Sequence, residues 1–280
     1  MKHLLIALAV SLVGATAAQA ADLAARTYTK APPLAAAYDW TGFYVGGNVG
    51  YGWGENTDPS LTVVNPGGAG NIGPFLTTGL PGFPSGNLFP NLKPSGAFGG
   101  GQFGYDKQFG TWVLGVVTDI QASDFKASGQ ITTPTATCCN VNESLSAKTD
   151  WFGTARAKAG FAANDWLFYG TGGLAYGDVK STIGFACTPG GVACSGVAFA
   201  GNTSEVRVGW AAGAGISKAW GNWNVGVEYL HIDLGRSSVT AFSTNGAFTT
   251  TTIAESQRFA EDMVRLTVNY KWGGPVVARY

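Results

Sequence analysis

The stretch VRLTVNYKW at residues 264–272 decides the fold. Its apolar residues alternate strictly with polar ones, and its apolar series ends on Tyr270 and Trp272. A strand places successive side chains on opposite faces, so one face of this segment is apolar and the other carries charge. Aromatic rings favour a membrane–water interface, and this stretch is therefore typical of a strand whose apolar face contacts lipid.

Seven further segments show similar alternation, and aromatic residues such as Trp40, Trp112, Trp166 and Trp223 mark their ends. We predict strands at 41–53, 96–107, 112–125, 145–161, 166–180, 205–220, 223–234 and 260–272. Very short turns join one set of ends, and long loops join the other set, at 55–95, 127–143, 181–203 and 236–254. This arrangement predicts an all-β fold: an eight-stranded antiparallel transmembrane β-barrel with short periplasmic turns and four long extracellular loops.

The first 20 residues read as a signal peptide. A basic start at Lys2 precedes an apolar run at 4–13, and Ala18-Gln19-Ala20 forms an A-x-A cleavage site. The run is too short for a helix to span a bilayer, which needs about 20 residues. We predict a signal peptide at 1–20, an extended periplasmic lead-in at 21–39, and the barrel at 40–280 with its long, proline-rich first loop at 55–95.

The composition fits a membrane barrel and argues against a nucleic-acid partner. The net charge is +0, and only 12% of residues are charged. The 42 glycines indicate close backbone approach inside a tightly closed sheet. We expect outer-membrane lipid and the barrel-insertion machinery as partners; the sequence does not identify a surface ligand for the external loops.

Four cysteines, Cys138, Cys139, Cys187 and Cys194, fall in predicted loops. An exported protein meets an oxidising compartment, which favours disulfides over metal binding. The pairings stay open. Cys187–Cys194 would close a small loop and leave Cys138–Cys139 as a strained neighbour pair, whereas two bridges could instead tie the second loop to the third. No CxxC motif or nearby histidine indicates zinc.

Several segments also resemble one known group of proteins. They are ADL at 21–23, YTKAPP at 28–33, YDWTGFYVGGN at 38–48, GGGQ at 99–102, TGGLAYG at 171–177 and VEYL at 227–230. The chain is similar to the small surface-antigen barrels of alphaproteobacteria, in the wider opacity-protein and outer-membrane-protein-A-like class. The resemblance implies an eight-stranded barrel of a kind often labelled a porin family.

Two departures from that pattern are visible. Such barrels mostly end on the aromatic residue of the last strand, whereas Gly273-Gly274-Pro275 follows Trp272 and the chain runs on to Tyr280. Either Trp272 or Tyr280 could therefore serve as the insertion signal. In addition, Val117 occupies an inward position where relatives commonly carry a glutamate.

Charged residues on the inner face are the one constellation that carries a site hypothesis. A charge that faces lipid near the midplane costs about 2–4 kcal/mol, so alternation directs these side chains into the lumen. The predicted polar network comprises Asp119, Arg156, Lys158, Arg207, Glu228 and Arg265. We expect Glu228 as its central acceptor, flanked by Arg207 and Arg265. The network could fill a narrow barrel with ion pairs, or it could form the charged constriction of a small pore.

No catalytic, cofactor or metal site is predicted. His231 is the one histidine that follows the signal peptide, and Asp233 shares its strand face, which suggests a dyad. A second acidic pair is missing, however, and we interpret His231 as an interfacial residue. The string Gly99-x-Gly101-x-x-Gly104 lies inside a strand and lacks the following helix of a dinucleotide site.

Two functions remain open on the sequence. The first is a structural surface protein of the outer membrane that supports envelope integrity and displays its loops for contact or adhesion, because exposed long loops are where contact functions reside. The second is a narrow passive porin for small solutes, which the many strand glycines favour because they leave lumen volume unfilled.

Overall fold

The computed structural model describes residues 38–55, 59–64, 92–134, 139–189, 198–246 and 250–272. The predicted signal peptide, nearly all of the lead-in, most of the first loop and Tyr280 lie outside these ranges. The described residues contain no helix that is long and apolar enough to cross a membrane.

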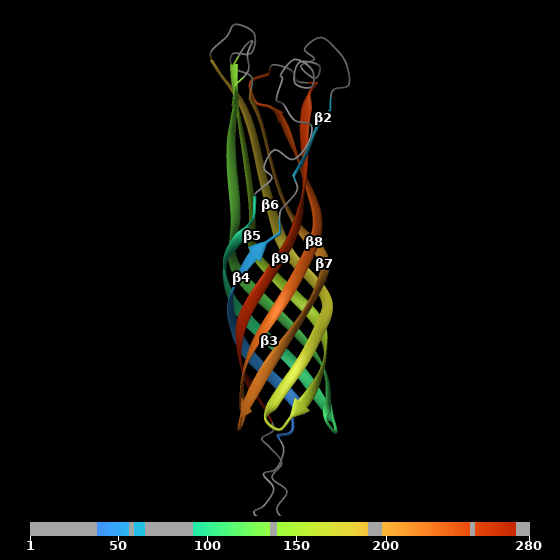
Figure 1. The fold of residues 1–280 in the computed structure, drawn as a ribbon. Helices are drawn as coiled ribbons and strands as arrows, with labels where there is room; N and C mark the ends of the chain where they lie inside the picture. The colour runs from blue at the N-terminus through green and yellow to red at the C-terminus, as the bar shows by residue number, and fades with distance from the viewer. Residues whose placement is uncertain are drawn as a thin grey trace, which may run out of the picture. The chain divides into compact units, whose positions relative to one another are not determined.

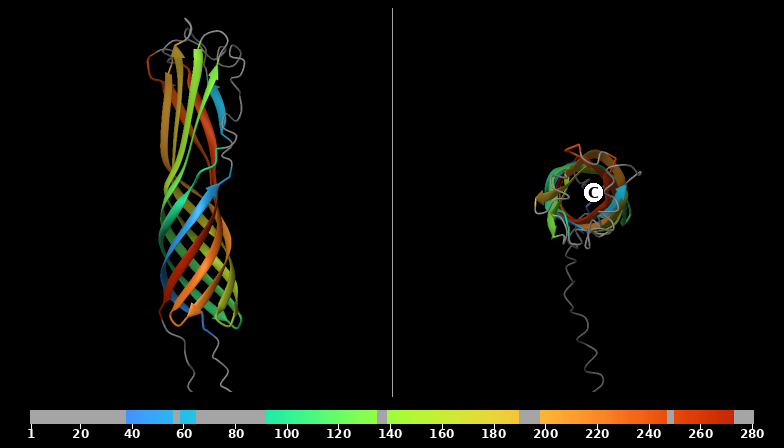
Figure 2. Two further views of the ribbon diagram at one scale, coloured as in Figure 1. Left: turned by 60° about the vertical axis from the view of Figure 1, so that its left-hand side comes forward. Right: turned by 90° about the horizontal axis from the view of Figure 1, so that it is seen from above.

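The described chain forms nine strands in one antiparallel sheet (Figure 1). They are β1 (Gly42–Gly54), β2 (Ser60–Val64), β3 (Ser95–Phe109), β4 (Trp112–Pro134), β5 (Cys139–Ala163), β6 (Trp166–Pro189), β7 (Ala198–Trp220), β8 (Trp223–Ser243) and β9 (Thr252–Lys271). Pairing of β1 with both β3 and β9 closes the ring, which Figure 2 shows from above.

Eight of these strands form the barrel, and the short strand β2 pairs with β9 beyond the point where β1 ends. β1 pairs with β9 as far as Gly54–Glu261, and β2 then pairs with the same strand from Ser60–Ser256 onward. The predicted eight-stranded antiparallel barrel is therefore confirmed. The short strand β2 lies inside the predicted first loop.

The turns at one end of the barrel are two-residue hairpins. They connect β3 to β4, β5 to β6 and β7 to β8, and each begins with a residue of positive φ: Gly110 (61°), Asn164 (57°) and Gly221 (57°). Glycine and asparagine tolerate this backbone conformation, which fits the twist of two paired strands. These turns lie where the sequence predicts them.

Next to the turns, the outer face of the barrel is apolar. On β4 the exposed side chains include Trp112, Leu114, Val116 and Ile120, in the predicted facing. Aromatic rings gather at the turn end, where Trp112 contacts Phe161 with ring centroids 6.3 Å apart. We call this apolar part of the barrel the membrane band; on β4 it covers residues 112–122, which is close to the roughly 9–11 residues that a tilted strand needs to span a bilayer.

Beyond the band, the strands continue further than predicted. Most of the predicted loops at 127–143, 181–203 and 236–254 are strand, so β4, β5, β6, β7, β8 and β9 extend the barrel as a second cylinder (Figure 2). We call this part the distal tube: residues 124–134, 139–149, 178–189, 198–209, 235–243 and 252–259, together with β2. Most of its outer positions are polar, with Val206, Val208 and Phe242 as exposed apolar exceptions, so alternation of apolar and polar residues does not reveal these parts of the strands.

Register shifts mark the border between the two parts. They occur at Ala122/Phe125 between β4 and β5, at Lys148/Phe152 between β5 and β6, and at Asp233/Gly235 between β8 and β9. A bulge inserts an extra residue and exchanges the two faces of a strand. Alternation counted from Arg156 would place Lys148 and Asp150 on the inner face of β5, but beyond the bulge both are partly exposed to the outside and form an ion pair with each other.

Candidate functional site

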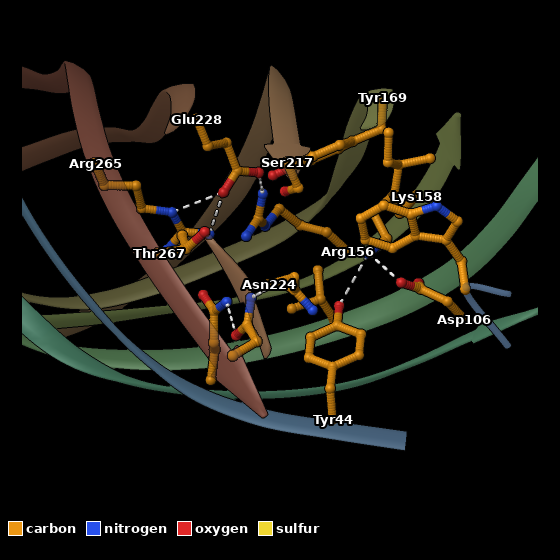
Figure 3. A pocket seen from close by; sticks show the side chains of 15 residues that line it. Tyr44, Asp106, Arg156, Lys158, Tyr169, Ser217, Asn224, Glu228, Arg265 and Thr267 are labelled. Atoms are coloured by element: carbon orange, nitrogen blue, oxygen red, sulfur yellow. Dashed lines mark hydrogen bonds and ion pairs between the residues drawn. The ribbon is translucent and has the colours of Figure 1, made fainter. Parts of the chain in front are cut away.

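The candidate site is an ion-pair network inside the membrane band; Figure 3 shows three of its members, Arg156, Glu228 and Arg265, beside a small cavity. The network consists of Asp119 on β4, Arg156 on β5, Glu228 on β8 and Arg265 on β9. The four side chains are 0–3% exposed to solvent. We refer to these four residues as the ion-pair network.

Arg156 bridges both carboxylates of the network. Its guanidinium lies 2.7 Å from Asp119 Oδ2 and 2.6 Å from Glu228 Oε1, and its Nε donates to Thr154 Oγ1 at 2.8 Å. The Thr154 hydroxyl in turn donates to Asp119 Oδ1 at 2.7 Å. Charge-assisted bonds of this kind are among the strongest hydrogen bonds in proteins, and they fix the four β-strand faces relative to one another.

Arg265 closes the network from the opposite side. Its Nη2 lies 2.6 Å from Glu228 Oε2 and 3.1 Å from Asp119 Oδ2. Glu228 and Arg265 are also paired directly in the register of β8 and β9. Two guanidinium groups face two carboxylates, so the network is neutral, which is what permits burial of four charges at one level of the barrel.

A second ion pair lies on the turn side of the network. Lys158 Nζ is 2.6 Å from Asp106 Oδ2 and 3.2 Å from the Tyr44 hydroxyl, and it also lies over the rings of Tyr44 and Tyr169. Both rings occupy space that glycines provide. A Cβ on Gly104 would lie 2.4 Å from the Tyr44 ring, and one on Gly215 would lie 2.6 Å from the Tyr169 ring.

This use of glycine bears on the pore hypothesis. The strand glycines could have left open volume in the lumen, but at Gly104 and Gly215 aromatic side chains fill the space. Amides occupy a further part, because Gln102 Nε2 donates to Asn269 at 2.5 Å and Asn269 Nδ2 donates to Asn224 at 2.8 Å.

Apolar side chains cover both sides of these polar layers. On the turn side, the rings of Tyr38 and Trp40 lie inside the barrel with their centroids 4.9 Å apart. Trp40 is therefore a lumen residue, and the prediction that it marks the membrane interface was wrong. On the distal side, Phe98, Phe125 and Phe152 pack with ring centroids 5.4–6.0 Å apart. These side chains leave little free path along the barrel axis.

The cavity between the network and Trp40 has a volume of about 20 Å³. A buried water needs about 10–15 Å³ measured in this way, so the cavity has room for one water molecule and not for a solute. At this level of the barrel, the ion pairs join β4, β5, β8 and β9 across the lumen.

The six predicted residues do not all lie together. Asp119, Arg156, Glu228 and Arg265 meet, and Lys158 lies in the adjacent pair, but Arg207 is far from Glu228. Gly215 pairs with Glu228, and Arg207 lies further along β7, on the order of 26 Å at about 3.3 Å per residue. Arg207 is part-exposed and lies 3.7 Å from Glu205; the second arginine on Glu228 is Arg156.

The predicted network leaves out three residues that contact it or the adjacent ion pair: Asp106, Thr154 and Tyr44. Asp106 lies near the end of β3. The many glycines of this segment make it hard to tell from the sequence which of its residues face inward. The inward position of Asp106 could be found by counting two residues at a time from Gln102. Alternation along residues 41–53 places Tyr44 on one face with Gly46 and Asn48, but it does not reveal the contact of its hydroxyl with Lys158.

The other predicted residues lie apart from the network. Cys138 and Cys194 fall outside the described residues, as does the side chain of Cys139, and Cys187 is half-buried on β6. The disulfide hypotheses remain predictions. His231 does not pair with Asp233: its Nδ1 lies 2.8 Å from Asp262 Oδ1 across the β8–β9 pair, on the outside of the barrel.

The distal tube holds a different kind of buried charge. Glu143 and Glu255 are 1% and 4% exposed, and among the residues that the structure describes neither carboxylate oxygen of Glu143 has a hydrogen-bond partner. Burial raises the pKa of Glu143 to about 7, and burial together with the neighbouring charge of Glu143 raises the pKa of Glu255 to about 7. Both groups bind a proton more readily than an exposed glutamate does.

Comparison with known proteins places this barrel in a family. The model of the outer membrane protein beta-barrel domain matches residues 5–271. The 31 kDa outer-membrane immunogenic protein of Brucella melitensis is 34% identical over 245 residues, which cover 85% of this chain and 90% of that protein. The 25 kDa outer-membrane immunogenic protein of Brucella abortus is 27% identical and covers 85% of this chain and 87% of its own length.

Solved structures show a weaker likeness. The outer membrane protein OprG from Pseudomonas aeruginosa aligns with 84% of this chain and 98% of its own, at 11% identity and a TM-score of 0.41. The family model and the Brucella relatives carry the assignment. The chain is an outer-membrane protein and belongs to the outer membrane protein beta-barrel domain family.

Proposed function

We propose that this barrel is a closed structural protein of the outer membrane, which supports the envelope and presents the distal tube outside the cell for contact or adhesion. The packed side chains in the lumen of the membrane band are the observation that supports this proposal. The ion-pair network, the Lys158–Asp106 pair and the aromatic layers above and below leave a cavity of about 20 Å³. A passive pore would need these layers to part.

The distal tube supports the display part of the proposal. Its outer face carries exposed polar side chains such as Lys126, Ser128 and Gln130, which suit water rather than lipid. Its end lies opposite the short turns (Figure 1). The names of the Brucella relatives call those proteins immunogenic, which agrees with surface exposure of this fold.

We also propose that the protein is not an enzyme. Acid–base catalysis and activation of a serine nucleophile commonly use a histidine. His231 is the one histidine in the described barrel, and it lies on the outside beside Trp210 and Asp262, where the hydrogen bond to Asp262 occupies one ring nitrogen.

Conductance across a planar bilayer tests the sealed lumen. The refolded mature chain, residues 21–280, should insert without steady channel openings. Its insertion is verified separately by protease protection of the membrane band. Stable openings whose ion selectivity changes in a Glu228→Gln variant would establish the pore and refute the closed barrel.

Epitope insertion tests the display of the distal tube. A short epitope placed after Asn245, at the end of the tube, should bind antibody on intact cells. The matched insertion after Asn164, in the β5–β6 turn, should bind only after the outer membrane is permeabilised. The reverse pattern would contradict the proposed orientation.

A further inference from the structure

We propose that Glu55, His231 and Asp262 form a binding site for a divalent transition metal ion on the outer face of the barrel. Glu55 directly follows β1, and His231 and Asp262 face each other in the register of β8 and β9. Three of their ligand atoms, one from each residue, lie within 4.8 Å of one another. One imidazole nitrogen and two carboxylate oxygens are a donor set that zinc uses in proteins.

Neighbouring residues hold two of the ligands in place. The Tyr229 hydroxyl donates to Asp262 Oδ1 at 2.6 Å, and the Trp210 ring packs on the His231 imidazole with centroids 5.1 Å apart. The backbone amide of Glu55 donates to the carbonyl of Ala260 at 3.0 Å, which anchors the third ligand. Contacts of this kind fix the orientation of metal ligands before the ion arrives.

The charges around the cluster also favour a cation. With a neutral imidazole, the two carboxylates leave a charge of about −2 at the site. Arg258 lies nearby on β9, but the Arg258 guanidinium contacts Asp233 at 2.5 Å. Within the described part of the chain, Glu55 forms no ion pair.

The position of the cluster strengthens this electrostatic argument. Val264 and Tyr229 are the next outward-facing residues along β9 and β8, and Val227 follows Tyr229 in the membrane band. Charges close to an apolar environment interact more strongly than charges in water. A divalent ion would neutralise the two carboxylates, and water could complete its coordination because His231 and Asp262 are 19% and 18% exposed.

The strand register explains why the sequence alone conceals this site. Glu55, His231 and Asp262 come from three segments that are far apart in the chain, and none of them belongs to a short metal-binding motif. Only the pairing of β9 with both β1 and β8 brings them together.

Calorimetric titration with Zn²⁺ tests the proposal. The refolded mature chain in detergent micelles carries His231 as its one histidine, since His3 belongs to the predicted signal peptide. The four cysteines are replaced by serine to remove competing thiols. We expect one Zn²⁺ per chain, with binding weakened at least tenfold by His231→Ala or by Asp262→Asn and less by Glu55→Gln.

Asp233→Asn supplies the matched control, because Asp233 is also a carboxylate near the outer face of β8 but its partner is Arg258. This variant should keep the Zn²⁺ affinity of the parent. A triple variant that combines His231→Ala, Asp262→Asn and Glu55→Gln should lose the site. The proposal would be overturned by a lack of saturable binding at millimolar Zn²⁺, or by unchanged Zn²⁺ affinity in this triple variant. Equal loss of affinity in Asp233→Asn and Asp262→Asn would also overturn it. Heat-modified mobility of each variant on gels confirms that the barrel has folded.

Discussion

The membrane band and the distal tube share six strands but differ in what covers their outer face, and the buried ion-pair network lies in the band. In the band, Val116 and Leu266 face outward while Arg156 and Arg265 lie inside. In the tube, Leu145 and Ile183 lie inside while Ser128 and Lys126 face outward. The solvent around each part accounts for the difference, since lipid accepts apolar surface and water accepts polar surface.

The comparison shows what each part depends on. The tube has an ordinary apolar core, formed by residues such as Leu145, Ile183, Phe199 and Ile253. The outer apolar side chains of the band gain little from contact with each other in lipid, so the band depends on its lumen, where the ion-pair network lies between two apolar clusters. Loss of one contact should therefore have different consequences in the two parts.

The largest effect is expected from removal of one charge in the ion-pair network. Arg156→Leu leaves Asp119 and Glu228 facing a single guanidinium, and it should lower the free energy of unfolding by about 3–5 kcal/mol. Denaturant unfolding in micelles measures this. The double variant Arg156→Leu, Glu228→Leu restores a one-to-one pair and should recover much of the loss. A cost below about 1 kcal/mol for the single variant would show that the network does not stabilise the band.

An arginine substitution on the outer face should have a different effect on stability in the membrane band than in the distal tube. Val116 and Ser128 are both exposed on the same face of β4. Val116→Arg should destabilise the folded barrel in a bilayer by about 2–4 kcal/mol, whereas Ser128→Arg should change its stability by less than about 0.5 kcal/mol. Equal costs at both positions would mean that lipid surrounds Ser128 as well, and the comparison would fail.

The two buried glutamates should make the tube sensitive to pH. The pKa values of Glu143 and Glu255 are raised from 4.5 to about 7 in the folded tube. The contribution of these two groups to the stability of the tube is therefore fully present below about pH 4.5, and it is lost as the pH rises towards about 7, because the folded tube must then bury carboxylate charge. Hydrogen exchange of β5 and β9, corrected for intrinsic rates, should show local opening easier near neutral pH by about 1–3 kcal/mol.

A charge-free variant checks the origin of this pH effect. Glu143→Gln with Glu255→Gln should flatten the dependence in the tube and leave exchange in the membrane band unchanged. A pH dependence that survives both substitutions would assign the effect to other groups.

The smallest effect is expected at the border between the two parts. Lys148 forms an ion pair with Asp150 at the outer surface, where its side chain is 48% exposed. Exposed pairs contribute little, so Lys148→Ala should change the free energy of unfolding by no more than about 0.5 kcal/mol. The same denaturant experiment measures this, and a loss comparable to that of Arg156→Leu would erase the distinction between inner and outer ion pairs.

Much of the membrane band was predictable from the sequence, because lipid imposes strict alternation on its strands. The facing of β9 and the inward positions of Asp119, Arg156, Glu228 and Arg265 all follow from that alternation. The distal tube was not predictable in the same way. Its outer positions carry Ser, Thr and Lys, which are also typical of loops.

The remaining misses arise from register, which a single strand does not reveal. The expected contact between Arg207 and Glu228 required the two residues to lie at one level, but the pairing of β7 with β8 separates them. The bulge near Lys148 changes which side chains of β5 face inward, and no proline or turn in the sequence predicts this change. The partnership of His231 with Asp262 likewise depends on how β8 is aligned with β9.

The most direct test of the account is the position of the membrane border on β4. Single spin labels on its outer face, at Leu114, Ile120, Lys126 and Gln130 in a cysteine-free background, report collision with oxygen in lipid or with a nickel chelate in water. The account predicts lipid-like behaviour at Leu114 and Ile120 and water-like behaviour from Lys126 onward. Lipid-like behaviour as far as Gln130 would place the distal tube inside the membrane and contradict it.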